Sequence, residues 1–182
     1  AIEAMIAAAQ KLEREGVKAI TSDCGFMLAY QDTVARAVDV PVMMSSMLQL
    51  PFIASLLAPG AEIGVVCAHA GSMTARVLDM AWPERNRTVH VAGMEEQPAF
   101  RRGILDEEGV LDTEAVEAET VAVTRAMIEA NPKIRAILIE CSNLPPYSAA
   151  VQAATGLPVF DFITMIDMVR ASVARPVFTG RY

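Results

Sequence analysis

The sequence predicts an α/β fold built on parallel sheets, and three observations support this prediction. Short apolar runs alternate with segments of helical periodicity along nearly all of the 182 residues. These runs are rich in Val and Ile and lack polar alternation, which is typical of strands buried on both faces of a parallel sheet. Repeated β-α-β units favour parallel strands joined by right-handed crossovers. Hydrophobic residues make up 53% of the chain, which is enough for a substantial core.

The expected elements begin with a helix, because Ile2, Met5, Ala9 and Leu12 recur at helical spacing. An α/β domain usually opens on a strand, so we expect a first strand to precede Ala1. Apolar runs then predict strands over residues 17–21, 40–45, 62–68, 88–92, 136–141 and 159–162.

Polar residues, prolines and glycines mark the ends of the predicted helices. Asp112 is expected to cap a helix whose apolar face carries Val116, Thr120, Val123 and Met127, and Asn131-Pro132 should end that helix. Three glycines lie between a helix and a strand, where helix C-caps favour glycine: Gly16, Gly60 and Gly156. The segment 57–61, with its Pro59-Gly60 pair, is the best candidate for a boundary between two lobes.

The composition excludes several classes of partner. The net charge of −7 argues against nucleic acid and anionic membranes, which are bound by clustered Lys and Arg. No apolar run reaches the roughly 20 residues of a membrane span, and the N-terminus does not resemble a signal peptide. The three widely spaced cysteines suit neither a disulfide scaffold nor a zinc motif, and they favour a reducing, cytoplasmic location.

Two of the cysteines occupy matched positions. Cys24 and Cys141 each follow a carboxylate at the end of an apolar strand and precede a small residue and the start of a helix. Ligands of open α/β sheets bind beyond such strand ends, and a helix N-terminus there would lower a thiol pKa and hold a substrate carboxylate. A single cysteine of this kind is more often a core residue, but the match favours a catalytic pair. Cys67 lies inside an apolar strand and is expected to be core.

Other candidate site residues carry a second interpretation. Ser45 and Ser46 could donate hydroxyl hydrogen bonds to a substrate, or could equally cap a helix before Met47. His69 follows a strand and could tune a thiol or hold a carboxylate, although a loop histidine without a role is at least as probable. Glu140 is expected to point away from the thiols and to bond to loop backbone.

Several motifs resemble the aspartate/glutamate racemase superfamily, which also includes hydantoin racemases, maleate isomerases and arylmalonate decarboxylases. The matching segments are 22–26, 41–46, 92–95, 140–147 and 156–161. The resemblance implies two pseudo-symmetric lobes of parallel sheet flanked by helices, with the site in the cleft between them and one cysteine from each lobe. It places 1–58 plus 164–182 in the first lobe, with a last helix near 164–175, and 59–163 in the second. It also implies no PLP, metal or nucleotide cofactor, and a homodimer.

The resemblance further implies a racemase or isomerase that acts on a small carboxylate or amino-acid-like substrate. One thiolate would remove a proton and the other thiol would return one to the opposite face. Backbone N–H groups of Gly25, Phe26, Ser142 and Asn143 would stabilise the developing charge. The first cysteine of the classical racemases is followed by Asn-Thr and the second by Thr. In this chain Gly25-Phe26 and Ser142-Asn143 stand at these positions instead. The resemblance therefore does not specify which substrate the protein takes.

Other functions are compatible with the same residues. A maleate-type isomerase would use one cysteine as a nucleophile. A decarboxylase is less favoured, because that branch keeps only one of the two cysteines. Outside enzymes, the chain could be a non-catalytic binder of small anions on the same scaffold, and a thiol–disulfide role is a weaker option.

Overall fold

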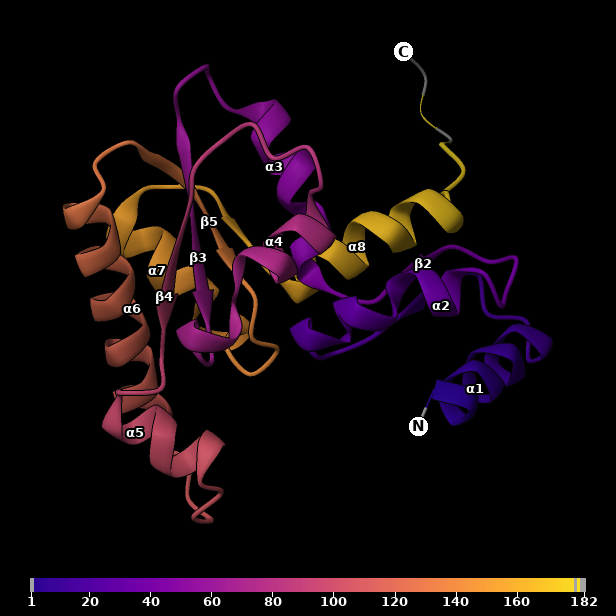
Figure 1. Ribbon diagram of the computed structural model, residues 1–182, viewed down its shortest axis with the longest axis horizontal. Helices are drawn as coiled ribbons and strands as arrows, with labels where there is room; N and C mark the ends of the chain where they lie inside the picture. The colour runs from indigo at the N-terminus through magenta and orange to yellow at the C-terminus, as the bar shows by residue number, and fades with distance from the viewer. Residues whose placement is uncertain (1, 179, 181–182) are drawn as a thin grey trace.

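The computed structural model of the chain describes residues 2–178 and 180, and contains two parallel β-sheets flanked by helices (Figure 1). The smaller sheet pairs β1 (Ile20–Thr21) with β2 (Val42–Met43). The larger sheet has the strand order β4-β3-β5-β6. Its strands are β3 (Glu62–Cys67), β4 (Val89–Gly93), β5 (Ile134–Ile139) and β6 (Val159–Phe160). The predicted α/β class with parallel sheets is confirmed.

The helical elements connect these strands. They are α1 (Ile2–Arg14), η1 (Gly25–Tyr30), α2 (Gln31–Ala35), η2 (Ser46–Gln49), α3 (Leu50–Leu56), η3 (Ala70–Ser72), α4 (Ala75–Ala81), α5 (Pro98–Phe100), η4 (Arg101–Leu105), α6 (Thr113–Ala130), η5 (Pro145–Tyr147), α7 (Ser148–Thr155) and α8 (Phe162–Val173). Every predicted strand run contains a strand, but most are shorter than predicted. The fifth strand begins earlier, at Ile134, and ends at Ile139, so Glu140 and Cys141 lie beyond it.

The larger sheet separates two apolar cores, as expected for strands buried on both faces. On one face, Val65 and Leu138 pack with Leu50, Ile53 and other residues of η2, α3 and α4. On the other face, Val66 and Ile137 pack with Val116, Met127 and Val151 of α6 and α7. These helices lie on opposite sides of the strands in Figure 1. A third cluster covers the smaller sheet and contains Ala9, Ile20, Val34 and Met44.

The predicted caps of two helices are confirmed. The Asp112 side chain accepts a hydrogen bond from the Ala115 N–H at 3.0 Å and begins α6. At the end of α7, Gly156 adopts a left-handed conformation with φ of 68°. Only glycine adopts that conformation at little cost, so the residue ends the helix and directs the chain into β6.

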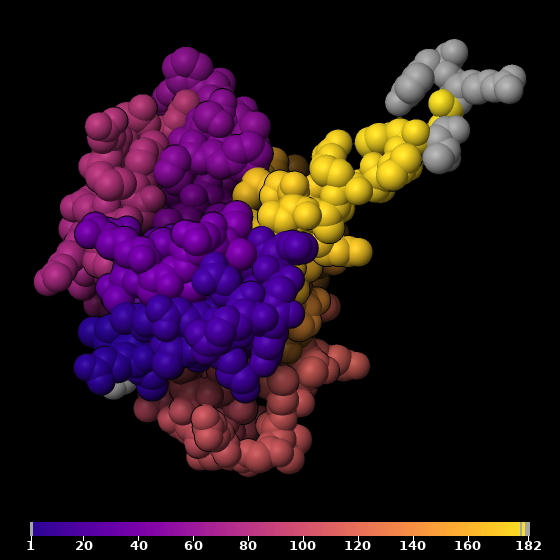
Figure 2. All heavy atoms as spheres, turned by 90° about the vertical axis from the view of Figure 1, so that its right-hand side faces the viewer, coloured from indigo at the N-terminus to yellow at the C-terminus, as the bar shows by residue number. Residues whose placement is uncertain are grey.

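Helix α8 lies against the N-terminal part of the chain. The Gln49 side chain donates to the Asp161 carbonyl at 2.9 Å and accepts a hydrogen bond from the Thr164 hydroxyl at 3.3 Å. Asp161 caps α8 together with Thr164. Figure 2 shows the N-terminal residues spread over one face of the molecule with α8 beside them. This helix spans 162–173 rather than 164–175, and the division into lobes at residues 58 and 164 stays a prediction.

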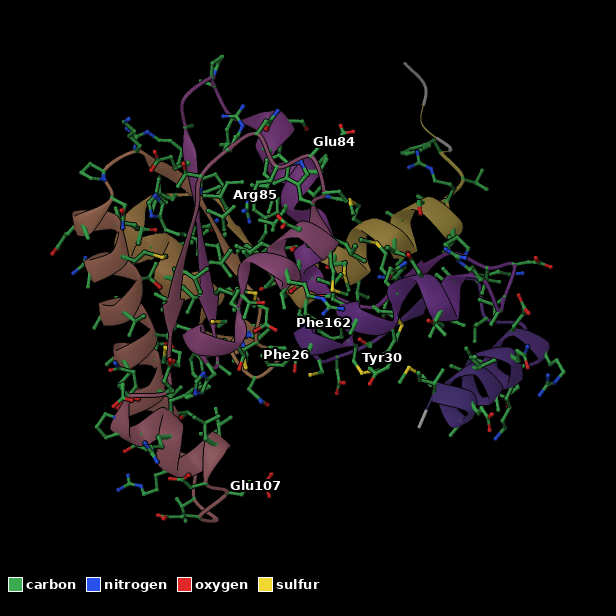
Figure 3. All side chains as sticks on the ribbon, in the orientation of Figure 1. Phe26, Tyr30, Glu84, Arg85, Glu107 and Phe162 are labelled. Carbon is green, nitrogen blue, oxygen red and sulfur yellow. The ribbon has the colours of Figure 1, made fainter. Side chains whose placement is uncertain are left out.

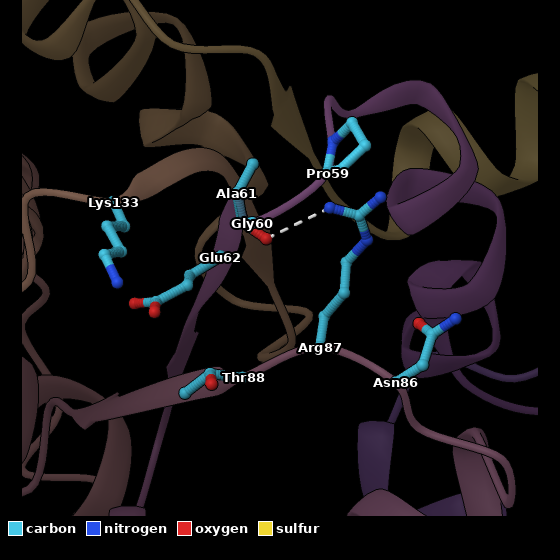
Figure 4. A pocket seen from close by; sticks show the side chains of 8 residues that line it. All are labelled: Pro59, Gly60, Ala61, Glu62, Asn86, Arg87, Thr88 and Lys133. Atoms are coloured by element: carbon cyan, nitrogen blue, oxygen red, sulfur yellow. Dashed lines mark hydrogen bonds between the residues drawn. The ribbon is translucent and has the colours of Figure 1, made fainter.

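The loop of residues 57–61 joins α3 to β3 and is held by one arginine. The Arg87 guanidinium donates to the carbonyls of Ala58 at 2.7 Å, Leu57 at 2.9 Å and Ala61 at 3.2 Å. Arg87 also lines a hollow of about 410 Å³ with Glu62 and Lys133 (Figure 4). This hollow lies at the amino ends of β3 and β4, whereas the cysteines lie at the carboxyl ends of their strands. Within the part of the chain that the structure describes, no helix is both long and apolar enough to cross a membrane.

Candidate active site

The structure places each cysteine after the carboxyl end of a parallel strand or at that end. Cys24 is exposed and directly precedes η1. Cys141 follows β5 and is only 8% exposed. Cys67 is the last residue of β3 and is fully buried, as predicted for a core residue. All three are free thiols.

The environment of Cys141 corrects one prediction. Burial raises the pKa of its thiol to about 11, and the negative charges of Glu140 and Cys24 act in the same direction. The Asn143 N–H and side chain partly oppose this rise by hydrogen bonding to the sulfur. The expected lowering towards neutral is therefore wrong for Cys141, because loss of hydration outweighs the backbone donors.

Glu140 is the main site residue that the sequence did not identify. Its side chain is buried, with 2% of the residue exposed, and burial raises the pKa of the carboxyl group from 4.5 to about 7. A hydrogen bond from the Ala68 backbone partly opposes this rise. The carboxylate also lies against Gly25, where an added Cβ would stand only 1.7 Å from Oε1. Glu140 thus bonds to loop backbone as predicted, but it lies among the cysteines rather than apart from them.

Ser45 and Ser46 are both buried, and their hydroxyl groups have partners within the protein. The Ser45 hydroxyl accepts a hydrogen bond from the Met47 N–H at 3.2 Å, which is the helix-capping alternative. The Ser46 hydroxyl lies 3.4 Å from the carbonyl oxygens of both Ile139 and Glu140 and donates to them. Ser46 therefore links η2 to the segment that carries Cys141, and its predicted contact with substrate stays a prediction.

His69 and Glu95 form a second polar group near Cys67. The exposed His69 ring places Nδ1 3.9 Å from Glu95 Oε1, and that oxygen accepts a hydrogen bond from the Ala70 N–H at 3.0 Å. The other oxygen, Oε2, is buried and lacks a hydrogen-bond partner in the described structure. The charge of Glu95 adds to burial and to Glu140 in raising the pKa of Cys67 to about 12. Carboxylates thus add to the effect of burial on the pKa values of the two buried thiols.

The remaining predicted residues lie beside the two cysteine loops. Gly25 is buried beneath Glu140, whereas Phe26 on η1 is 40% exposed (Figure 3). Ser142 and Asn143 line an open hollow of about 530 Å³ together with Tyr147 and two α6 carboxylates, Glu114 and Glu117. Among residues 2–178 and 180, no three His, Cys, Asp or Glu side chains are grouped so as to hold a metal ion.

Comparison with known families now identifies the chain. The model of the family described as Asp/Glu/Hydantoin racemase matches residues 1–172. The chain belongs to this family. The match covers both cysteine loops and all six strands that the structure describes, so the predicted resemblance is confirmed.

Curated proteins that resemble the chain are named as lyases. It is 35% identical to "Dimethylsulfoniopropionate lyase 5" of Emiliania huxleyi (strain CCMP1516), over 97% of this chain and 36% of that protein. It is 36% identical to "Dimethylsulfoniopropionate lyase 7" of the same organism, over 89% of this chain and 49% of that protein. It is 34% identical to the dimethylsulfoniopropionate lyase of Durusdinium sp. clade D, over 92% of this chain and 57% of that protein. The chain thus spans between 36% and 57% of the length of these relatives.

Solved structures share the fold of the chain at lower sequence identity. Arylmalonate decarboxylase superposes with a TM-score of 0.65 at 17% identity, covering 99% of this chain and 78% of that one. A putative Asp/Glu racemase from Yersinia pestis superposes with a TM-score of 0.65 at 16% identity, covering 94% of this chain and 72% of that one. An aspartate racemase homologue from Pyrococcus horikoshii OT3 superposes with a TM-score of 0.63 at 22% identity, covering 92% of this chain and 74% of that one.

These relatives correct the predicted activity. The sequence led us to expect a racemase or other isomerase, including a maleate-type isomerase as an alternative. The curated relatives at about 35% identity are named as lyases instead. The prediction was wrong because the motifs that carried it are shared by the superfamily and do not specify which reaction a member performs.

Proposed function

We propose that this chain belongs to a lyase that cleaves a sulfonium carboxylate such as dimethylsulfoniopropionate. The observation that carries this proposal is its 34–36% identity to three dimethylsulfoniopropionate lyases over 89–97% of the chain. A carboxylate that carries a sulfonium group on its third carbon is suited to elimination, because the sulfonium is a good leaving group. Proton transfer by a thiolate, which the cysteine loops led us to expect, is the step that such an elimination requires.

The reaction balances without any further reactant. A thiolate takes the proton from the carbon next to the carboxylate. The electrons of that C–H bond form the C=C double bond, and the bond between the third carbon and sulfur breaks with its electrons remaining on sulfur. The products are dimethyl sulfide and acrylate, and the protonated thiol returns its proton to solvent.

We assign the base to Cys24 and a neutral role to Cys141. Cys24 is exposed, so its thiolate can remain hydrated, whereas burial raises the pKa of Cys141 to about 11 and keeps that thiol protonated near neutral pH. A neutral thiol can donate a hydrogen bond to the substrate carboxylate as charge builds on it. The N–H groups of Gly25, Phe26, Ser142 and Asn143 are the proposed further donors.

The charge of the site supports a substrate that also carries a positive group. Glu140 adds to burial in raising the pKa of Cys141, which supports a negative potential at the site when that carboxylate is ionised. A negative potential attracts a sulfonium cation, although it is unfavourable for a simple dicarboxylate. His69, beside Glu95, and the hydroxyl groups of Ser45 and Ser46 complete the proposed surroundings of the substrate.

Three further features belong to the same proposal. The site lies in a cleft between a lobe of residues 1–58 plus 164–182 and a lobe of residues 59–163, although Ala1, Thr179, Arg181 and Tyr182 fall outside the described residues. The enzyme acts as a homodimer, which gel filtration with light scattering can test. The free thiols of the described structure support a reducing, cytoplasmic location.

The direct test is to incubate the purified protein with dimethylsulfoniopropionate and to measure dimethyl sulfide in the headspace and acrylate in solution. We expect equal amounts of both products. Cys24→Ser and Cys141→Ser should each lower the rate by about 10²-fold or more, because each removes a positioned acid–base group. Cys67→Ala is the matched control and should retain activity, since Cys67 is a core residue.

Two results would contradict the proposal. The first is the absence of dimethyl sulfide from well-folded protein supplied with this substrate. The second is full activity in both serine variants, which would remove the thiols from the mechanism. Circular dichroism and thermal melting of every variant would confirm that a lost rate does not reflect lost structure.

A further inference from the structure

The segments that carry the three cysteines converge on a single carboxylate. Glu140 is the residue directly before Cys141. Its carboxylate lies against Gly25, the residue directly after Cys24, so closely that any side chain at position 25 would overlap it. The same carboxylate is hydrogen-bonded by the backbone of Ala68, the residue directly after Cys67. One buried side chain therefore contacts a neighbour of each thiol.

The carboxylate is poorly compensated in this position. Its residue is 2% exposed, and none of the salt bridges among the described residues involves Glu140. The other titratable groups that act on the buried thiols are also anionic when ionised: Cys24 for Cys141, and Glu95 for Cys67. His69, which can carry a positive charge, faces Glu95 at 3.9 Å. A second negative charge beside Glu140 is therefore costly.

We propose that Glu140 is a positioning residue that holds the Cys24 and Cys141 loops together and keeps Cys141 in its protonated form. This inference rests on the proposed division of roles, in which Cys24 is the base and Cys141 is the neutral donor. Glu140 acts through the thiols and does not contact the reacting atoms. Its two contributions can be separated: its shape fits against Gly25, and its charge disfavours a Cys141 thiolate.

The two contributions respond to different substitutions. Glu140→Gln keeps nearly the same shape and removes the charge, whereas Glu140→Asp keeps the charge and shortens the side chain. Glu140→Met is a second neutral variant, in case the amide does not fold. Glu95→Gln is the matched control, because Glu95 acts on Cys67 and is not among the groups that act on Cys141.

The measurement is the rate of alkylation of Cys141 by iodoacetamide as a function of pH, in a Cys24→Ser, Cys67→Ala background. We expect the neutral variants to shift the profile to lower pH and to react at least about threefold faster at pH 8, which corresponds to a pKa lower by about half a unit. Glu140→Asp and Glu95→Gln should follow the parent profile. A purely structural role would leave the Glu140→Gln profile unchanged, because the shape is kept, and would move the Glu140→Asp profile by altering the burial of Cys141.

The inference is overturned if the neutral variants follow the parent profile, or if Glu140→Asp shifts it as far as they do. Alkylation requires no turnover, so this outcome is independent of the lyase assay. If the protein forms no dimethyl sulfide but the profile shifts as expected, the proposed function fails and the effect of Glu140 on the thiol stands. If dimethyl sulfide forms but the profile is unmoved, the lyase stands and the role of Glu140 falls.

Discussion

The Glu140 carboxylate occupies the space in which a side chain at Gly25 would lie. An ideal Cβ at position 25 would stand 1.7 Å from Oε1 and 2.6 Å from Cγ of Glu140. Both residues are buried, and they belong to loops more than a hundred residues apart in the sequence. The absence of a side chain at position 25 is therefore what allows the two cysteine loops to approach each other.

Gly25→Ala should destabilise the protein by about 1–3 kcal/mol, because the new methyl group displaces a buried carboxylate. Urea unfolding measures this cost. Gly180→Ala is the control, since an added Cβ there meets no atom within 4 Å. In a Glu140→Ala background the cost of Gly25→Ala should fall by at least about 0.5 kcal/mol, the usual scale for residues in contact. Strict additivity of the two substitutions would contradict the observed contact.

The stability of the protein should decrease between about pH 4.5 and pH 7 because of Glu140. Burial raises the pKa of this carboxyl group from 4.5 to about 7, so within this range the folded state holds a proton that the unfolded state releases. The stabilisation that comes from the raised pKa of Glu140 is complete below pH 4.5 and is lost as the pH rises through 7. Unfolding free energies of the wild type should fall by up to about 1.4 kcal/mol per pH unit relative to Glu140→Gln. Parallel curves for the two proteins would refute this prediction.

The three thiols should differ in reactivity in the order Cys24, Cys141, Cys67. Cys24 is exposed, whereas burial is the main cause that raises the pKa to about 11 at Cys141 and to about 12 at Cys67. Brief treatment of the native protein with iodoacetamide at pH 8, followed by peptide mass spectrometry, measures the three rates. The urea-unfolded protein is the control and should react at all three positions at similar rates. Native labelling of Cys67 as fast as Cys24 would be incompatible with the observed burial.

Arg87→Ala should destabilise the protein by about 2 kcal/mol, because three carbonyl groups of the loop 57–61 lose their donor. Arg87→Lys should recover only part of this loss, since an ammonium group cannot reproduce the planar arrangement of guanidinium donors. Arg76→Ala is the control, because Arg76 is exposed and should change stability by less than about 0.5 kcal/mol. Equal stabilities of Arg87→Ala and Arg76→Ala would show that the bonds to the loop contribute nothing.

The fold could be predicted from sequence because its signals are local. Apolar runs located all six strands of the described structure, and Asp112 and Gly156 marked helix ends through short-range geometry. The same runs overestimated strand length, since β1 pairs over only Ile20–Thr21. Pairing requires a partner strand, and an apolar run does not reveal how long its partner is.

The site could be predicted only in part. The matched settings of Cys24 and Cys141 correctly located both thiols just beyond the carboxyl ends of parallel strands, and their action as a pair stays a prediction. The role of Glu140 was missed, because its position against Gly25 depends on contacts between distant segments. One signal was present in the sequence: Glu140 directly follows the apolar strand of Ile137 and Ile139, and a carboxylate there must be buried or must turn towards a polar site. The chemical outcome required the relatives, since proton removal is common to racemases and lyases.

The hydrogen bonds of Ser46 and Gln49 have a consequence for how proteins with this fold could diversify. Ser46 bonds to the backbone directly before Cys141, and Gln49 bonds to the start of α8, so both fix the segment 46–49 against distant parts of the chain. Hydrogen bonds are directional, so a substitution of either side chain would change how this segment is held against the Cys141 loop and α8. Substitutions at position 49 could therefore change which substrates are accepted without replacing a group that touches them. New specificities in this family can accordingly arise away from the reacting atoms, while both thiols are retained.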